Sequence, residues 1–175
     1  MDGVWVFIGA DSVIFAILFM SFMKDRLGSP ALFESSRHTL NFNLGGIDTL
    51  ILLTSSWLVA LGVQAANRGE LDRVPRFLLG GVLTGCAFVI SKSTEYAEKF
   101  VAGITPATDA FYMWYFTLTG IHLAHVLAGT SLLTYLWIKA RRRNLDIKVT
   151  ECVASFWHLV DLLWIVLFPL LYLQR

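Results

Sequence analysis

The amino-acid sequence predicts an all-α, polytopic membrane protein whose single domain, residues 1–175, is a bundle of five transmembrane helices. Hydrophobic residues make up 56% of the chain and charged residues only 15%, whereas soluble domains carry about a quarter charged residues. The charged residues also gather in short islands between long apolar stretches. Five stretches reach the roughly 20 residues that a helix needs to cross the hydrocarbon core: 4–23, 47–66, 77–96, 111–138 and 154–173.

Each predicted span is separated from the next by polar or charged residues. The first lacks the basic segment of a signal peptide, and it follows Asp2 and contains Asp11 instead, so we interpret it as a helix of the mature protein. A polar turn around Asp48 leads into the second span. Charged islands separate the remaining spans, at 67–76, 97–110 and 139–153.

The distribution of basic residues predicts the orientation of the helices. A cytoplasmic N-terminus places eight lysines and arginines in the inner segments 67–76 and 139–153, against five in the outer segments and the C-terminal tail, where Arg175 is counted. Inner loops are enriched in Lys and Arg. We therefore expect a cytoplasmic N-terminus and a periplasmic C-terminus, chiefly because of the basic cluster at 139–143.

Composition and motifs exclude several classes of function. The net charge of +1 gives no indication of nucleic-acid binding. Cys86 and Cys152 do not form a CxxC pair, and we interpret them as small buried hydrophobic residues. The sequence has no Gly-rich phosphate loop, no metal-ligand spacing and no nucleophile–base pattern. We therefore predict no catalytic centre and no metal site in this chain.

Charged residues inside the predicted spans need a reason, because each costs at least ~2.5–3.5 kcal/mol on the insertion scale. Asp11 is one of them, and the small residues Gly9, Ala10 and Ser12 beside it suit close helix contact. Two interpretations stay open for Asp11. It is either a protonatable carboxylate on or near a proton path, or a buried carboxyl that hydrogen-bonds a neighbouring helix.

Histidines occur in two of the predicted spans. His122 and His125 share one face of the fourth, and His158 shares a face with Asp161 in the fifth. The expected helix bounds place His125 and His158 roughly 13 Å apart along the membrane normal, too far for two ligands of one haem iron. We therefore favour interhelical hydrogen bonds for these residues over metal ligation. His125 lies nearer the level of Asp11, which predicts a polar pair between them.

Acidic residues also mark the outer end of the third predicted span. Lys92 and Glu95 are three residues apart and can neutralise each other, and Glu98 follows one turn later. We interpret Lys92, Glu95 and Glu98 as a cluster at the membrane interface whose long side chains reach the aqueous phase. Aromatic residues near the span ends are expected to anchor the interface: Tyr112, Trp114, Tyr115, Trp137, Trp157 and Tyr172.

Four segments on four predicted helices resemble subunit III of the haem–copper oxidase superfamily. They are residues 7–15 (FIGADSVIF), 91–99 (SKSTEYAEK), 119–126 (TGIHLAHV) and 156–164 (FWHLVDLLW). The third matches the family pattern G-x-H-x-x-H-V, and the fourth matches W-H-x-V-D-x-x-W. They occur in the family's order and extend over nearly the whole chain. By this resemblance Asp11 is the family's membrane carboxylate, and the other matching positions are Glu95, His122, His125, His158 and Asp161.

The resemblance implies a role without chemistry of its own. Subunit III binds no redox cofactor, packs beside the haem-containing catalytic subunit, and supports assembly, proton uptake and sustained turnover. It also holds phospholipid in a cleft between its helices. We therefore expect a bacterial inner-membrane protein whose partners are a catalytic subunit and membrane lipids, not nucleic acid. The longer, seven-helix form has two further helices that make one wall of that cleft.

The count of five helices restricts the resemblance to the short forms of subunit III. Short forms occur in quinol oxidases, in some bacterial cytochrome c oxidases and as the accessory subunit of nitric oxide reductase. Segments 32–41 and 48–56 look most like the nitric oxide reductase accessory type, as do 102–108 and 111–116. We therefore favour that subtype over a true oxidase subunit.

Two alternative functions rest on single features of the sequence. A haem b membrane anchor rests on the three membrane histidines alone. A stand-alone proton or solute carrier rests on Asp11 and Glu95, but it lacks the inverted repeat and broken helices of many transporters.

Overall fold

The computed structural model describes residues 2–173 and confirms an all-helical, multi-pass membrane protein. Five helices in this part of the chain are long and apolar enough to cross a membrane. The described residues contain no strand. The spanning helices are α1 (Asp2–Gly28), α3 (Phe42–Asn67), α4 (Val74–Val101), α5 (Ala110–Arg141) and α6 (Ile147–Phe168), which continues into a π-helical turn, η1 (Pro169–Leu173). Arg175 lies outside the described residues.

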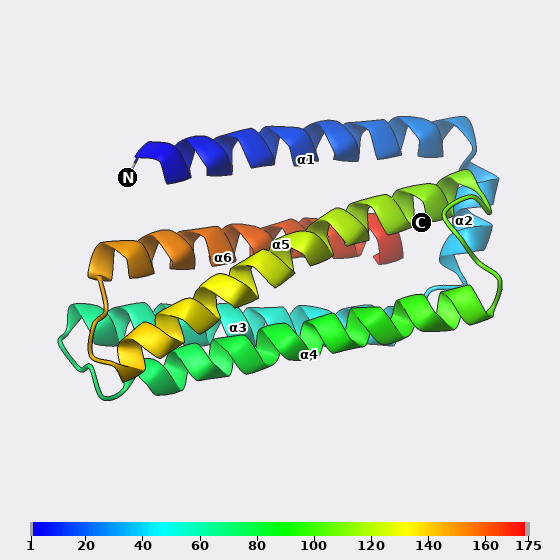
Figure 1. Cartoon of the computed structure of the whole chain (residues 1–175). Coiled ribbons are helices and arrows are strands. Elements are labelled where there is room, and N and C mark those ends of the chain that lie inside the picture. The colour runs from blue at the N-terminus through cyan, green and yellow to red at the C-terminus, as the bar shows by residue number, and fades with distance from the viewer. Residues whose placement is uncertain (1, 174–175) are drawn as a thin grey trace.

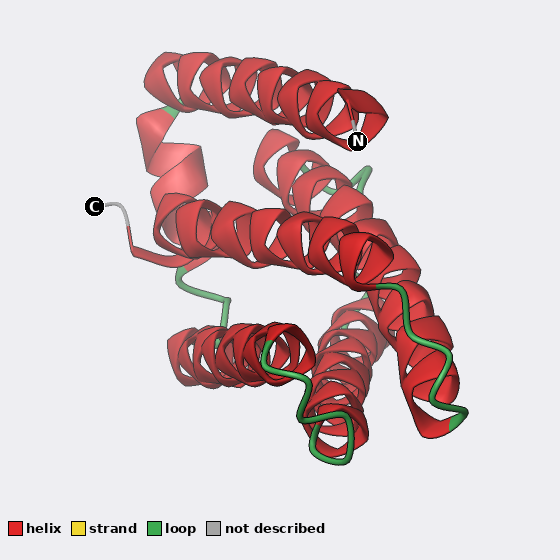
Figure 2. Cartoon of the chain, turned by 90° about the vertical axis from the view of Figure 1, so that its left-hand side faces the viewer, coloured by secondary structure: helices red, strands yellow, loops and turns green. Residues whose placement is uncertain are grey.

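The five long helices run in alternating directions (Figure 1). Helices α3, α4, α5 and α6 pack around one another, and α1 lies along the outside of this group against α5 and α6 (Figures 1 and 2). We call the end that holds the N-terminus the inner end and the opposite end the outer end, following the expected orientation. The face that α1 turns to the bundle carries Asp11, Phe15 and Phe22, which are buried and spaced four and seven residues apart.

Two helices begin at least five residues earlier than their apolar stretches indicate. Helix α3 starts at Phe42, where Asn41 accepts hydrogen bonds from the N–H groups of residues 43 and 44. Helix α6 starts at Ile147, where Asp146 accepts from the N–H groups of residues 148 and 149. An N-cap side chain satisfies the free amides of a first turn, so a helix can begin within polar sequence. The turn expected around Asp48 is therefore wrong, because Asp48 lies inside α3.

A short helix between the first two predicted spans, which the sequence analysis did not predict, closes the outer end. Helix α2 (Pro30–Arg37) has its proline in the first turn, where the missing N–H costs nothing. Phe33 packs edge-on against Phe22 of α1 and Phe111 of α5, with ring centroids 5.5 and 5.8 Å away. Ser36 donates to Asp109, the N-cap of α5, at 2.8 Å. Helix α2 therefore connects the outer ends of α1 and α5.

Glycine permits close contacts of α4 and α5 with α6. A Cβ atom at Gly129 of α5 would lie 2.6 Å from the Trp157 ring of α6, and one at Gly85 of α4 would lie 3.0 Å from the same ring. Trp157 is fully buried between these two glycines. Small residues bring membrane helices close enough for van der Waals packing, which here replaces the hydrophobic effect as the main cohesive force.

Replacing Gly129 by alanine is therefore expected to destabilise the bundle. Overpacking costs about 1–3 kcal/mol, which exceeds the roughly 1 kcal/mol by which alanine is favoured over glycine in a helix. Gly46→Ala is the matched control, because a Cβ atom there meets nothing within 4 Å. Unfolding of the purified variants in mixed detergent measures the difference. Equal stability of the two variants would contradict the close α5–α6 contact.

Candidate functional site

Asp11 and His125 form a polar pair between α1 and α5. His125 Nε2 lies 3.1 Å from Asp11 Oδ1, and the carboxyl is almost completely buried. The other ring nitrogen, Nδ1, lies 2.8 Å from the carbonyl oxygen of Ile121. A carbonyl only accepts hydrogen bonds, so Nδ1 must carry a hydrogen. The structure thus brings together the two residues that the sequence analysis paired.

The geometry places one proton between Asp11 and His125. With Nδ1 protonated, Nε2 either accepts a hydrogen from a neutral carboxyl group or donates one to a carboxylate. In both cases the contact contains a single hydrogen, and only its position differs. The His125 side chain is 19% exposed, so this hydrogen lies near the lateral surface of the bundle.

His158 and Ser56 form a second polar contact, between α6 and α3. The distance from Ser56 Oγ to His158 Nδ1 is 2.7 Å. Ser56 also lies beside Asp161, although neither carboxyl oxygen of Asp161 has a hydrogen bond of good geometry to a described residue. Because α6 begins at Ile147, His158 is eleven residues into the helix and not four. The axial offset from His125 is then about 8 Å, smaller than the sequence indicated.

His122 has aromatic neighbours in place of a polar partner. Its ring lies 5.2 Å from that of Trp164 and 5.6 Å from that of Phe88, measured between centroids. Neither ring nitrogen hydrogen-bonds another described residue. The interhelical hydrogen bonds expected of the histidines are therefore present at His125 and His158. They are absent at His122 within the described chain.

The sequence analysis placed Lys92 and Glu95 at the membrane interface. The structure instead buries both in the outer half of the bundle. Lys92 is 1% exposed and donates to Glu95 Oε2 at 2.5 Å. Asp48 of α3 is fully buried, and its Oδ2 lies 3.1 Å from Lys92 Nζ. Tyr172 of η1 accepts from Lys92 at 3.1 Å and donates to Glu95 Oε1 at 2.9 Å. Lys92 is therefore held by partners from three elements.

The sequence analysis missed Asp48 and Tyr172 as partners of Lys92, although a signal for the first was present. In antiparallel neighbours, residues equally far from the shared end lie at one depth. Asp48 is six residues from the start of α3 at Phe42, and Glu95 is six residues from the end of α4 at Val101. The predicted spans 47–66 and 77–96 already give the two residues equal depth, but Asp48 was assigned to a turn. Glu98, by contrast, is exposed, as an interfacial residue should be.

Most of the aromatic residues expected at the interface belong to the core. Tyr112, Tyr115, Trp157 and Tyr172 are buried, while Trp114 and Trp137 are only partly covered. Trp114 donates to Asp25 at the outer end of α1 at 2.8 Å. A position near the end of a span therefore did not distinguish anchors from core residues.

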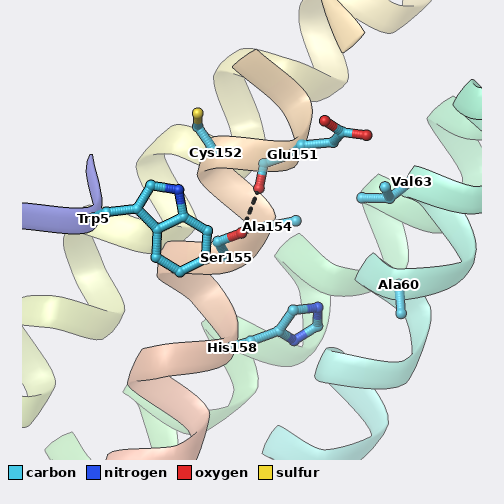
Figure 3. A pocket seen from close by; sticks show the side chains of 8 residues that line it. All are labelled: Trp5, Ala60, Val63, Glu151, Cys152, Ala154, Ser155 and His158. Carbon is cyan, nitrogen blue, oxygen red and sulfur yellow. Dashed lines mark hydrogen bonds between the residues drawn. The ribbon is translucent and has the colours of Figure 1, made fainter. Parts of the chain in front are cut away.

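Two cavities lie beside the inner half of α1. One of about 390 Å³ lies between α1, α3 and α6, with Trp5 on one side, Ala60 and Val63 on the other, and α6 side chains including His158 between them (Figure 3). The other, of about 380 Å³, is almost entirely apolar. Its lining comes from α1, α5 and α6: Gly3, Phe7, Ala128, Leu132, Cys152, Val153 and Phe156.

No metal centre emerges from the described residues, among which no three His, Cys, Asp or Glu side chains are grouped to hold an ion. Both nitrogens of His125 and one of His158 are engaged by protein groups. The described residues thus present separate polar contacts between helices: Asp11 with His125, Ser56 with His158, and the group around Lys92.

Comparison with known proteins assigns the family. The model of cytochrome c oxidase subunit III matches residues 1–174. The chain belongs to this family. The chain is 31% identical to quinol oxidase subunit 3 of Bacillus subtilis (strain 168), over 98% of this chain and 85% of the relative. It is 30% identical to cytochrome c oxidase subunit 3 of Corynebacterium diphtheriae, over 97% and 85% of the two chains.

The match extends to ubiquinol oxidases. Cytochrome bo(3) ubiquinol oxidase subunit 3 of Pseudomonas aeruginosa is 28% identical, over 98% of this chain and 83% of the relative. The resemblance seen in the sequence, to subunit III of the haem–copper oxidases, is thereby confirmed. The subunit III family member described here is a multi-pass membrane protein.

The Asp11–His125 contact is expected to appear as energetic coupling. Asp11→Ala and His125→Ala should destabilise the protein non-additively, with an interaction energy of about 0.5–3 kcal/mol, because each substitution leaves the other residue without its hydrogen-bond partner. Unfolding of the four members of the double-mutant cycle in mixed detergent measures this energy. Ser12→Ala combined with His125→Ala is the control and should be additive, because the Ser12 hydroxyl bonds Ile8 of its own helix. Additivity in both cycles would rule out the pair.

Proposed function

We propose that this protein is a non-catalytic subunit of a respiratory haem–copper complex and that it supports assembly, proton uptake and sustained turnover of the catalytic subunit. Family membership over nearly the full chain supports the place in the complex. The observation that carries the proton role is the Asp11–His125 pair. It holds one exchangeable hydrogen inside the membrane-spanning part of the protein, near its lateral surface.

Proton uptake through such a pair needs two properties, and the contacts support both. The hydrogen can move between oxygen and nitrogen within one contact of 3.1 Å without any change of backbone. The partly exposed imidazole can also exchange it with a group outside the bundle. The aromatic rings of Phe15 and Phe156 lie 5.7 and 6.3 Å from that of His125 and restrict it to one side.

We propose a nitric oxide reductase as the catalytic partner. The resemblance of segments 32–41 and 102–108 to the accessory subunit of that enzyme supports this choice. An oxidase is the other candidate, because the relatives named above are subunits of quinol and cytochrome c oxidases. We place the complex in a bacterial inner membrane. We also propose that phospholipid acyl chains occupy the apolar cavity beside α1, whose lining suits a lipid tail.

Co-purification tests the partner. Gentle solubilisation of cells that express the tagged protein should recover a haem-containing catalytic subunit, with nitric oxide reductase activity in the eluate. Recovery with oxygen-reducing activity would replace the proposed partner by an oxidase. A monodisperse protein without any haem-containing partner, which nevertheless conducts protons in vesicles, would overturn the subunit role.

The orientation has its own test. We propose that the N-terminus is cytoplasmic and the C-terminus periplasmic, because Lys139 and Arg141 to Arg143 lie at the inner end. Reporter domains fused after residue 72 and after residue 106 should be active in the cytoplasm and in the periplasm, respectively. The reverse result would invert the proposed topology.

Substituting Asp11 is expected to slow proton uptake. In the intact complex, Asp11→Asn removes the exchangeable carboxyl group but keeps its shape, so turnover supported by proton uptake should fall several-fold while the complex still assembles. Proton uptake by the reconstituted complex measures the effect. Glu98→Gln, on the exposed outer end of α4, is the matched control. Unchanged proton uptake in the assembled Asp11→Asn complex would contradict the proton role.

A further inference from the structure

The buried group formed by Asp48, Lys92, Glu95 and Tyr172, here called the outer cluster, contains two carboxyl groups and one ammonium group. Each of the four side chains is no more than 3% exposed. The cluster lies about 9 Å below the outer end of α4, since Glu95 precedes Val101 by six residues. If every group had its usual charge in water, the cluster would carry a net charge of −1 in a medium with little water.

The hydrogen bonds show which carboxyl group is the ionised one. Glu95 accepts at both oxygens, from Lys92 at Oε2 and from Tyr172 at Oε1. Two accepted hydrogen bonds, one of them from an ammonium group, favour a carboxylate. Lys92 in turn donates to Glu95 and Tyr172, while Asp48 Oδ2 lies 3.1 Å from its Nζ. Lys92 and Glu95 therefore form a neutral pair.

Asp48 is then left without a charge partner of its own. It is fully buried, and neither of its oxygens has a hydrogen bond of good geometry to a described residue. Its one ion-pair contact among the described residues is with Lys92, whose charge Glu95 already balances. An uncompensated carboxylate in the interior is strongly disfavoured, and such a group takes up a proton.

No other ionisable group of the described chain pairs with Asp48 in a way that would neutralise its carboxylate. Tyr96 on the same helix bonds Thr119, and Tyr115 of α5 lies beside Glu95. Neither Tyr115 nor His122 of α5 has a hydrogen bond of good geometry from its side chain to a described residue. Lys99, one turn beyond Glu95, donates to the carbonyl oxygen of Thr39 at 2.7 Å. On α6, Trp164 contributes only its ring face, 4.6 Å from Lys92 Nζ.

We propose that the outer cluster is a proton-binding site, in which one proton is shared by the carboxyl groups of Asp48 and Glu95 around Lys92. The proton resides on Asp48 while Glu95 is paired with Lys92. If Asp48 takes the place of Glu95 beside Lys92, the proton transfers to Glu95 and the cluster stays neutral. The two carboxyl groups thus titrate as one unit. This site is distinct from the Asp11–His125 pair and does not depend on the proposed function.

Infrared difference spectroscopy of the full-length protein tests the proposal, because a protonated carboxyl group has a carbonyl band that a carboxylate lacks. The wild-type protein should show such a band at neutral pH, shifted in D₂O, and Asp48→Asn should remove it. Glu95→Gln should remove the same band, because Asp48 then becomes the only carboxylate beside Lys92 and ionises. Both variants keep one carboxylate per ammonium group, so both are expected to fold.

The Glu95→Gln variant separates a shared proton from simple burial. If Asp48 is protonated only because it is buried, its band persists in Glu95→Gln, and the proposal is wrong. Absence of any band sensitive to Asp48→Asn in the wild-type protein would also overturn it. Lys92→Gln should add a second protonated carboxyl group, since neither acid then has a cation. Glu98→Gln, an exposed acid on the same helix, is the control and should change no protonated-carboxyl band.

Discussion

A charged or strongly polar side chain in the hydrocarbon core needs a protein partner, and this requirement determines how the helices of this subunit III family member pack. Each polar group that an isolated helix would expose to lipid is costly. The contacts that remove this cost join different helices. Asp11 and His125 connect α1 to α5, Ser56 and His158 connect α3 to α6, and the outer cluster connects α3, α4 and η1. Apolar packing then fills the space between these contacts.

The four helices α3 to α6 and helix α1 are held in different ways. Helices α3 to α6 combine polar contacts with close glycine packing, as at Gly85 and Gly129 around Trp157. Among the side chains of α1 whose burial is described, one polar group, Asp11, is buried, together with a few rings, and α2 adds a further connection. Two cavities flank its inner half. The pair proposed to exchange protons therefore lies where a loosely covered helix meets a tightly packed bundle.

Sequence alone predicted the number and order of the spanning helices because hydrocarbon thickness sets a length that composition reveals. It did not predict α2, which is short and polar enough to resemble a loop, and whose position depends on Phe33 meeting Phe22 and Phe111. The Asp11–His125 pair could be predicted from depth, since both residues lie well inside long helices. The partnership of Asp48 with Lys92 was missed although the predicted spans place Asp48 and Glu95 at equal depth, because Asp48 was assigned to a turn. Tyr172 was assigned to the interface because it lies near the end of a span. Its burial depends on the turn that begins at Pro169, which the sequence did not predict.

Stability alone does not account for the charges in the outer half of the bundle. Burying an ion pair costs several kcal/mol of desolvation per ion, and well-packed apolar residues of similar volume are often as stable or more so. If the charged side chains served only to join α3 to α4, one acidic residue would be enough to neutralise Lys92. The second acid, fully buried and without a partner of its own, adds cost unless it carries a proton. Asp11 beside His125 also places a proton within a single contact, so this pair and the outer cluster share one property. In the outer cluster, two acids face one cation, so one proton is needed for neutrality. In the Asp11–His125 pair, one hydrogen can change its place between the two side chains.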